Sequence, residues 1–436
     1  MTEALASRHG PIGAARKAPL APDIFQAWWL TSFGVALAAL YLVYFAILYR
    51  AGTWIVAQTG LPIYTDFGCG WAAGMQALHG DIAALYDPAG FAKAQAALFP
   101  ADHDFYPNWP YPPTFFLVLA PLALLPYRWA FILWDALTLS ACVAVVYLIV
   151  RRKTAIALAL AAPYTAWNFL AAHYGFLTGA LLGAALLTLE RRPVLAGIFL
   201  GCLTYKPQFG VLFPVALVAG REWRAIAGAA ATGLLLAGLS AVVFGGAAWA
   251  AFPHQLVAQT GLNLMAGADS NWGYLQSVYG LARSLRAPAG LAWFAQAAIA
   301  VGAAVVVWQV WRSAIPYRLK AAALSAAALL ATPYAFAYDM AALAIPAAFL
   351  AADQLERGLL PGDKAIWAAL FGAPLAVLVT LGDNAHGTTF GGTPIALLTA
   401  LALFAAILRR IAVLPADSAP SYRRSACGAQ PILPGA

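Results

Sequence analysis

Four ionisable side chains stand out in this sequence because each lies within or close to an apolar stretch. Asp66 and Lys206 each lie beside aromatic residues and glycine or proline, His173 joins two apolar runs, and Asp339 follows shortly after a Pro-Tyr pair. Ionisable groups are unfavourable in an apolar medium and persist mainly where they face a cavity or carry out chemistry. A carboxylate can act as a general base and a cation can bind an anion. Together these residue types suit group transfer from a phosphate-linked donor.

Each of these residues also has a structural interpretation that the sequence leaves open. Asp66 could be a solvated loop acid that caps the next helix. Lys206 could be an interfacial lysine whose ammonium group extends to water. Asp339 could cap or pack a helix, and His173 could be an interfacial histidine without a role in a site.

Other polar residues are expected to be structural. Asp135 lies within an apolar run, where a hydrogen bond to a neighbouring helix is its expected role. Asp102, His103 and Asp104 are expected to be solvated in a loop. The four cysteines and six histidines show no spacing typical of a disulfide framework or a metal site, so we expect no metal and no other cofactor.

The composition indicates the medium that surrounds these residues. Of 436 residues, 63% are apolar and only 10% are charged, and the mean hydropathy is +0.76. A soluble globular protein carries about a quarter charged residues, so a soluble cytoplasmic enzyme is excluded. The net charge of +8 does not indicate nucleic-acid binding, because Lys and Arg occur in short groups between apolar runs. These groups are residues 151–153, 191–192, 221–224, 312–320 and 409–410.

The apolar runs predict an all-α polytopic membrane protein with about 10–13 membrane helices. A cytoplasmic tail, residues 1–24, precedes a transmembrane domain, residues 25–411, and a second cytoplasmic tail, residues 412–436. The first span is expected at residues 25–48. Further spans are expected at residues 129–150, 155–170, 176–189, 195–204, 211–219, 225–244, 291–310, 321–332, 335–351, 366–381 and 394–408, with a bend around Lys206.

The longest polar stretch, residues 51–112, is acidic and is expected to be an extracytoplasmic loop. Within it, residues 71–79 and 88–98 have the spacing of helices that lie along the membrane surface. Residues 114–125 form either a half-helix or a short true span. Two further outer loops are expected at residues 245–286 and 382–393.

The distribution of Lys and Arg predicts that both termini are cytoplasmic. In this topology Asp66, His173, Lys206 and Asp339 all lie on the outer side of a cell (inner) membrane that the chain crosses several times. This convergence supports a common site more strongly than any single residue does.

Three blocks of sequence occur in a recognisable order. The first comprises Asp66-Phe67, Ala77-Leu78-His79-Gly80, Leu85-Tyr86-Asp87 and Tyr111-Pro112-Pro113 followed by residues 121–126. The second comprises residues 191–197, Tyr205-Lys206-Pro207-Gln208 and Pro214, and the third comprises Pro333-Tyr334 and Tyr338-Asp339. Over roughly residues 66–346 this order resembles glycosyltransferase family 87. That family holds polyprenol-phosphate-mannose-dependent α-1,2-mannosyltransferases of the GT-C superfamily.

The resemblance implies a GT-C-like bundle whose active site faces away from the cytoplasm, with Asp66 as the general base. Lys206 and His173 are then expected to bind the donor phosphate. Residues expected to bind substrate are Tyr111, Tyr174, Gln208, Tyr338 and Asp339. One departure occurs at Ala172-His173-Tyr174-Gly175, where family members often have Gly-Gln, so donor contacts at this point are expected to differ.

The hypothesis is therefore a membrane glycosyltransferase that moves a hexose, expected to be mannose, from a polyprenyl-phosphate sugar to a hydroxyl of a lipid or glycan acceptor. A single displacement inverts the anomeric carbon and needs one carboxylate. The alternative from another class is a lipid or polyprenyl-sugar transporter (a flippase), whose site would lie at mid-membrane between inverted repeats. A purely structural membrane subunit explains neither Asp66 nor Lys206.

Overall fold

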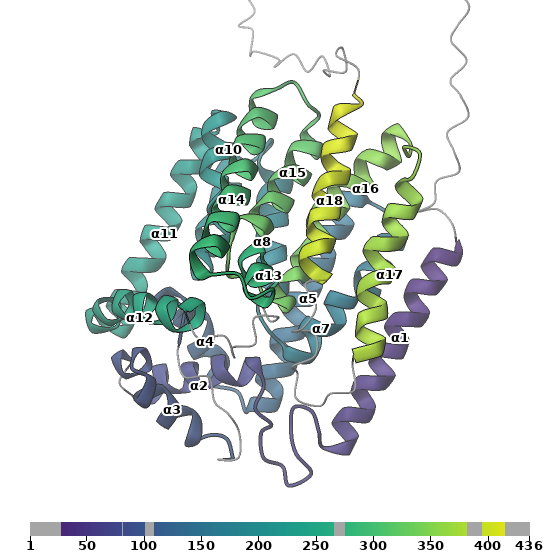
Figure 1. The fold of residues 1–436 in the computed structure, drawn as a ribbon. Helices are drawn as coiled ribbons and strands as arrows, with labels where there is room; N and C mark the ends of the chain where they lie inside the picture. Colours follow the sequence, from purple (N-terminus) through teal and green to yellow (C-terminus); the bar gives the residue numbers. More distant parts are fainter. Residues whose placement is uncertain (1–27, 81, 101–108, 266–274, 382–394, 415–436) are drawn as a thin grey trace, which may run out of the picture.

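The computed structural model describes residues 28–80, 82–100, 109–265, 275–381 and 395–414. In these ranges the chain is helical, with isolated β-bridges as the only strand-like pairing (Figure 1). Large apolar side chains such as Leu234 and Val242 are 74% and 85% exposed on one helix alone. Such surface is unfavourable in water and favourable against lipid. The predicted all-α polytopic membrane protein is confirmed.

Five of the described helices are long and apolar enough to cross a bilayer. They are α1 (Trp28–Ala51), α5 (Tyr127–Val150), α11 (Trp223–Phe244), α14 (Ala289–Arg312) and α18 (Ile395–Ala412). Each coincides with an expected span to within a few residues. A helix of 24 residues extends about 36 Å, enough for about 30 Å of hydrocarbon.

A sixth span is bent in the middle. Residues 155–170 were expected to form one helix, but the structure has α6 (Lys153–Ala161) and α7 (Pro163–Ala171) at 58° to each other. Ala162 between them is extended, because a residue before proline is disfavoured in the helical region. The break directs the end of α7 toward the site described below.

Lys206 lies at a second break, as the sequence predicted. The preceding elements are α8 (Gly175–Thr188), α9 (Pro193–Cys202) and the 3₁₀ turn η4 (Leu203–Tyr205). After Lys206 the chain continues through η5 (Pro207–Gly210) into α10 (Phe213–Ala219). Pro207 removes a backbone donor and restricts Lys206, so a continuous helix cannot form here.

Where two surface helices were expected, the first loop contains α2 (Asp66–His79) and α3 (Pro88–Ala96), with η2 (Ala83–Tyr86) between them. α2 begins five residues earlier than expected, and its residues 67–74 are buried against other parts of the chain. The loop leads to η3 (Pro113–Phe115) and α4 (Phe116–Ala123). At eight residues α4 covers about 12 Å, so it cannot cross the membrane, and the half-helix interpretation of this segment holds.

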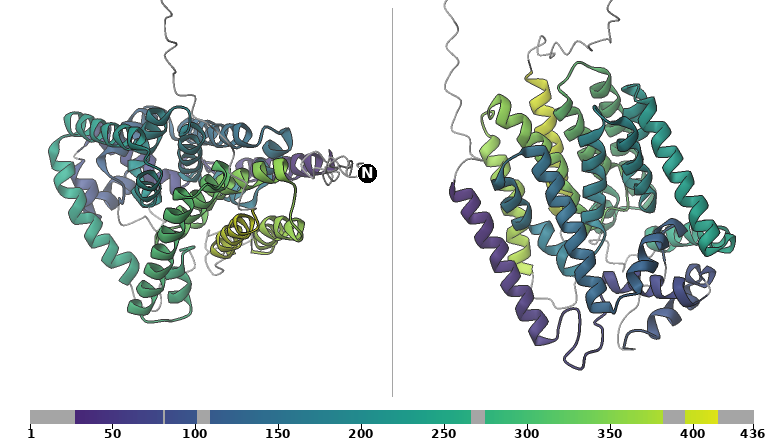
Figure 2. Two further views of the ribbon diagram at one scale, coloured as in Figure 1. Left: turned by 90° about the horizontal axis from the view of Figure 1, so that it is seen from above. Right: turned by 180° about the vertical axis from the view of Figure 1, so that it is seen from behind.

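One expected loop is largely helical instead. Residues 245–286 contain α12 (Gly246–Met265) and α13 (Val278–Ser284). No long apolar run marks α12, since it lies across the end of the bundle rather than along it. It packs against η2 near α2 and α3 (Figures 1 and 2). The loop expected at residues 382–393 lies outside the described residues.

In the C-terminal half, α15 (Tyr317–Ala331) is the most completely buried helix. In α15 the ten consecutive residues 321–330 are all small or aliphatic and all buried, so α14, α16 and α18 can pack against this helix. Residues 335–351 were expected to form one span, but they divide into η7 (Ala337–Leu343) and α16 (Ala344–Arg357). The described helices also include α17 (Asp363–Leu381).

Candidate functional site

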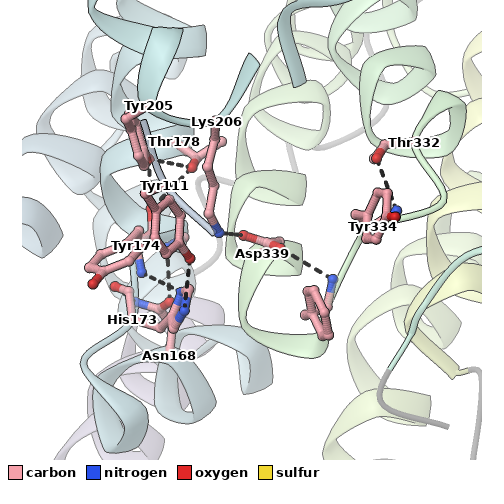
Figure 3. A network of polar contacts seen from close by, with 12 residues as sticks. Tyr111, Asn168, His173, Tyr174, Thr178, Tyr205, Lys206, Thr332, Tyr334 and Asp339 are labelled. Atoms are coloured by element: carbon pink, nitrogen blue, oxygen red, sulfur yellow. Dashed lines mark hydrogen bonds and ion pairs between the residues drawn. The ribbon is translucent and has the colours of Figure 1, made fainter. Parts of the chain in front are cut away.

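Lys206 and Asp339 form a buried ion pair between the two halves of the bundle (Figure 3). The Lys206 Nζ donates a hydrogen bond of 2.6 Å to Oδ1 of Asp339, and the two side chains are 3% and 0% exposed. A snorkelling lysine would keep its ammonium group in water, so that interpretation is wrong. Burying two charges is unfavourable unless geometry and hydrogen bonds compensate.

The second oxygen of Asp339 caps the turn that carries it. Its Oδ2 accepts a hydrogen bond of 3.2 Å from the backbone amide of Phe336, at the start of η7. The capping interpretation of Asp339 is therefore correct, and it holds together with the ion pair rather than instead of it. The cap fixes the carboxylate so that its other oxygen faces Lys206.

Four aromatic rings surround the Lys206 ammonium group. The ring centroids lie 5.1 Å away for Tyr338, 5.7 Å for Tyr174, 5.8 Å for Tyr111 and 5.9 Å for Phe209. Each ring presents an electronegative face to a cation within about 6 Å. The rings come from the first loop, the α7–α8 turn, η5 and η7, so four separate parts of the chain meet at one ammonium group.

His173 lies in the turn between α7 and α8, outside both helices, and joins this cluster. Its ring stacks on Tyr338, with centroids 3.5 Å apart. Burial, followed by the charge of Lys206, lowers the pKa of His173 well below its usual value, so the ring is neutral. Nδ1 accepts a hydrogen bond of 2.8 Å from the Tyr174 amide, so the proton belongs on Nε2.

The His173 Nε2 atom faces the hydroxyl of Tyr111 at 3.4 Å. Burial raises the pKa of Tyr111 well above its usual value, so its hydroxyl remains protonated. Tyr86 donates a hydrogen bond of 2.9 Å to the Tyr111 carbonyl and holds this part of the loop in place. The pair offers two neutral hydrogen-bond donors beside the ammonium group of Lys206.

Asn168 is a positioning residue that the sequence interpretation missed. Its Nδ2 donates to the His173 carbonyl at 3.3 Å, and its Oδ1 accepts from the Gly175 amide at 3.1 Å. A Cβ atom on Gly175 would lie 2.2 Å from the Tyr338 carbonyl, so only glycine allows η7 to approach here. The sequence feature that could have identified Asn168 is its amide side chain within the otherwise apolar helix α7.

Asp66 is the first residue of α2 and is half-buried. The N-cap position belongs to Thr65, whose hydroxyl is 3.0 Å from that of Tyr127, so the interpretation of Asp66 as the cap is wrong. Asp66 is close enough to interact electrostatically with both Lys206 and Tyr174. The structure therefore brings Asp66, His173, Lys206 and Asp339 to one end of the bundle.

Not every candidate joins the network. Gln208 is half-buried and makes no hydrogen bond within the described part of the chain. Asp135 is buried in α5, and neither of its carboxylate oxygens has a hydrogen-bond partner there, so the predicted bond to a neighbouring helix is wrong. Asp102, His103 and Asp104 lie outside the described residues. In the described ranges no group of three His, Cys, Asp or Glu side chains could hold a metal ion.

The family model of glycosyltransferase family 87 matches residues 109–333. The match includes Tyr111, His173, Tyr174, Lys206 and Gln208, whereas Asp66, Tyr338 and Asp339 lie outside it. No curated protein and no solved structure gives a match to the chain.

Proposed function

This chain belongs to glycosyltransferase family 87 and is a membrane glycosyltransferase, and on this premise we propose a specific reaction for it. It moves a hexose, expected to be mannose, from a polyprenyl-phosphate sugar to a hydroxyl group of a lipid or glycan acceptor. The reaction takes place on the extracytoplasmic side of the cell (inner) membrane.

In this reaction the acceptor oxygen attacks the anomeric carbon while the bond from that carbon to the phosphate oxygen breaks. Asp66 takes the acceptor proton, and the polyprenyl phosphate leaves with the bonding electron pair. The attack and the departure occur on opposite faces, so the anomeric carbon inverts. One carboxylate is enough, because phosphate is already a good leaving group.

Lys206 is assigned to the donor phosphate. An ammonium group has three N–H donors, and Asp339 uses one of them at 2.6 Å. The remaining donors, with the neutral Nε2–H of His173, can bind phosphate oxygens in a site from which water is largely excluded. The Tyr111 hydroxyl lies beside them, and Tyr174, Tyr338, Asp339 and Gln208 are the further residues assigned to substrate.

One observation gives this proposal its main support. A half-buried carboxylate at the start of α2 lies within electrostatic reach of the one buried lysine of the family-matched segment. A base and a phosphate-binding cation on neighbouring elements are what a one-step sugar transfer requires. A transporter would not need a carboxylate at the end of the bundle.

The extracytoplasmic location is supported by the positions of the basic groups. α5 and α8 both begin near the site and end at Arg151-Arg152 and Arg191-Arg192. The site and these groups thus lie at opposite ends of the bundle. Basic residues next to membrane spans are retained in the cytoplasm, so the site end would face outward.

The decisive experiment incubates membranes that contain the protein with a set of radiolabelled polyprenyl-phosphate sugars, followed by identification of the labelled product. We expect covalent transfer of one sugar, inverted at its anomeric carbon. Membranes that carry Asp66→Asn serve as the control and should form little product. Movement of intact labelled donor across the membrane, with no new glycosidic bond, would contradict the proposal and favour a transporter.

A further inference from the structure

The proposed reaction assigns Tyr174 to substrate but gives no role to its buried hydroxyl group. The side chain is 1% exposed, and its Oη has no hydrogen-bond partner within the described residues. Buried polar groups are nearly always hydrogen-bonded, and the few exceptions in a native structure usually have a reason. In Figure 3 this hydroxyl points away from the Lys206–Asp339 pair.

The hydroxyl contacts Gly70 of α2. A Cβ atom on Gly70 would lie 2.2 Å from Oη, whereas the next atoms are Cζ of the same ring at 3.3 Å and Leu119 Cδ2 at 3.6 Å. Gly70 is not among the glycines with a positive φ, so its backbone does not need glycine. Glycine is therefore required at position 70 only because a larger residue would collide with a neighbour, and the atom it would collide with is the Tyr174 Oη.

The face of α2 that carries Gly70 also carries Asp66. Residues four apart lie one above the other on a helix, so Asp66, Gly70 and Gly74 share one face. A Cβ atom on Gly74 would lie 2.5 Å from the Leu119 carbonyl of α4. Two glycines therefore bring this face close to its neighbours, and Asp66 stands at the end of the face.

The other side of the Tyr174 ring faces the cation. The Lys206 Nζ lies 5.7 Å from the ring centroid. The ring is held in edge contacts with Phe115, Tyr111 and Trp134, with centroids 4.7, 5.1 and 5.5 Å away. Packed on three sides, the ring has little freedom to rotate. It forms a rigid connection between Lys206 and α2.

We propose that Tyr174 is a positioning residue whose phenol ring, seated against Gly70, sets the separation between Asp66 and the Lys206–Asp339 pair. This inference rests on the proposed function, in which Asp66 acts on the acceptor and Lys206 on the donor phosphate. The two reactants meet only if these groups keep a fixed spacing. A displacement of about 1 Å can lower a rate about 100-fold without weakening binding.

The contact geometry gives a direct test by size compensation. Gly70→Ala places a methyl group against Oη, so α2 or the ring must move. We expect kcat to fall by about 10- to 100-fold, with the donor KM unchanged within about two-fold. Tyr174→Phe deletes the atom that the methyl group meets. The double variant Gly70→Ala/Tyr174→Phe should therefore recover kcat by about 10-fold relative to Gly70→Ala.

Gly210→Ala is the matched control, because Gly210 lies near Lys206 and a Cβ atom there would have its nearest neighbour at 3.8 Å. Its kcat should remain within about two-fold of the wild-type value, since ordinary contacts cost little. Polyprenyl-phosphate mannose is the donor probe, with a membrane extract as the source of acceptor. A wild-type kcat for Gly70→Ala, or no recovery in the double variant, overturns the inference.

If Gly70→Ala does not fold, the Tyr174→Phe variant by itself tests the positioning role. Removing an unpartnered buried hydroxyl should leave the melting temperature unchanged or raise it. If the inference is correct, kcat should fall at least about three-fold at an unchanged donor KM, because α2 loses its contact with the Tyr174 hydroxyl. An unchanged kcat overturns it, and so does a raised donor KM, which would make the hydroxyl a substrate contact.

Asp66→Asn, measured in parallel, separates this inference from the proposed function. If Asp66→Asn keeps the wild-type rate, the assignment of Asp66 as the base in the proposed function fails, whatever the Gly70 variants do. If Asp66→Asn is inactive and the Gly70 variants behave like the wild type, only the positioning role of Tyr174 fails.

Discussion

At the scale of single residues, the Lys206–Asp339 ion pair complicates the interpretation of substitutions at either position. Both side chains are almost completely buried, so each charge depends on the other for compensation. Breaking such a pair by removing one partner typically costs about 3–5 kcal/mol, because the remaining charge is left unpaired. A loss of activity in a single variant could therefore reflect misfolding rather than a lost phosphate contact.

The first prediction separates these two effects. Lys206→Met should lower the melting temperature of the detergent-purified protein, because Asp339 then stays buried without a cation. Lys206→Met/Asp339→Asn removes both charges and keeps an oxygen for the Phe336 amide, so most of the stability should return. Donor KM should remain at least about 10-fold raised, since a charge-assisted hydrogen bond contributes about 1.5–3 kcal/mol. A double variant with a wild-type donor KM would show that Lys206 has only a structural role.

The second prediction concerns Asp66. Asp66→Asn keeps the size of the side chain but cannot accept a proton, so the transfer rate should fall by about 10²–10⁴. Donor affinity should be nearly preserved, because the carboxylate is assigned to the acceptor. The matched control is Asp87→Asn, which changes an exposed acid of the same loop that caps α3. Initial rates on purified protein in nanodiscs measure both variants. A loss under 10-fold for Asp66→Asn would place the base elsewhere, with Asp339 as the next candidate.

The sequence identified the charged residues of this site but not their connections. A charge in an apolar stretch is visible in any sequence, so Lys206 and Asp339 could be selected by type. Their pairing spans 133 residues and no sequence pattern encodes it. The contact of Tyr174 with Gly70 depends on a single oxygen atom and is equally invisible. For Asp135, the residue type alone suggested a hydrogen bond to a neighbouring helix, and the structure does not contain this bond.

At the scale of elements, α9 is held against α11 by glycines. A Cβ atom on Gly197 would lie 2.3 Å from the Ala225 carbonyl, and one on Gly228 would lie 2.8 Å from the Val194 carbonyl. These obstructing atoms belong to the backbone and cannot rotate away. Because α9 leads directly into η4 and Lys206, this close packing also fixes one wall of the site.

The third prediction uses two glycines of the same helix. Gly228→Ala should destabilise the protein by about 1–3 kcal/mol, because the helices must separate to admit the methyl group. Gly238→Ala is the control, since a Cβ atom there would have no neighbour within 4 Å. It should be neutral or stabilising by up to about 1 kcal/mol, because alanine favours helices. Denaturation of the two variants under the same conditions provides the comparison, and equal stabilities would contradict the packing argument.

The elements themselves were predictable to different degrees. Long apolar runs predicted α1, α5, α11, α14 and α18, because an apolar helix of this length is sufficient to cross the bilayer. The break at Lys206 was expected from its proline, whereas the similar break at Pro163 was missed, although a proline marks it in the sequence as well. A helix that lies across the end of the bundle, as α12 does, has mixed polarity and looks like a loop in the sequence.

At the scale of the whole molecule, the two ends of the bundle differ in charge. The end opposite the site holds an ion-pair network between the last turns of α16 and α18. Asp353 bonds Arg410 at 2.9 Å and Arg357 at 3.0 Å, and further pairs join Arg409 to Asp363 and Arg318 to Glu356. With Arg151-Arg152 and Arg191-Arg192 at this end as well, most basic groups are far from the site.

The last prediction follows from this asymmetry and tests the location of the site. Lys and Arg next to membrane spans resist translocation, so the basic end should be cytoplasmic and the end with α2, α3 and α12 extracytoplasmic. Asp87 and Arg191 are both exposed and lie at opposite ends, so each can be replaced by a cysteine reporter. The background variant has its native cysteines replaced by alanine; Cys69 and Cys142 are buried in the structure. A membrane-impermeant maleimide applied to intact cells should label Asp87→Cys and leave Arg191→Cys unlabelled. Permeabilised cells provide the control, because both positions should then react. Labelling of Arg191→Cys in intact cells, with Asp87→Cys protected, would place Asp66 in the cytoplasm and remove the basis for an extracytoplasmic lipid-linked donor.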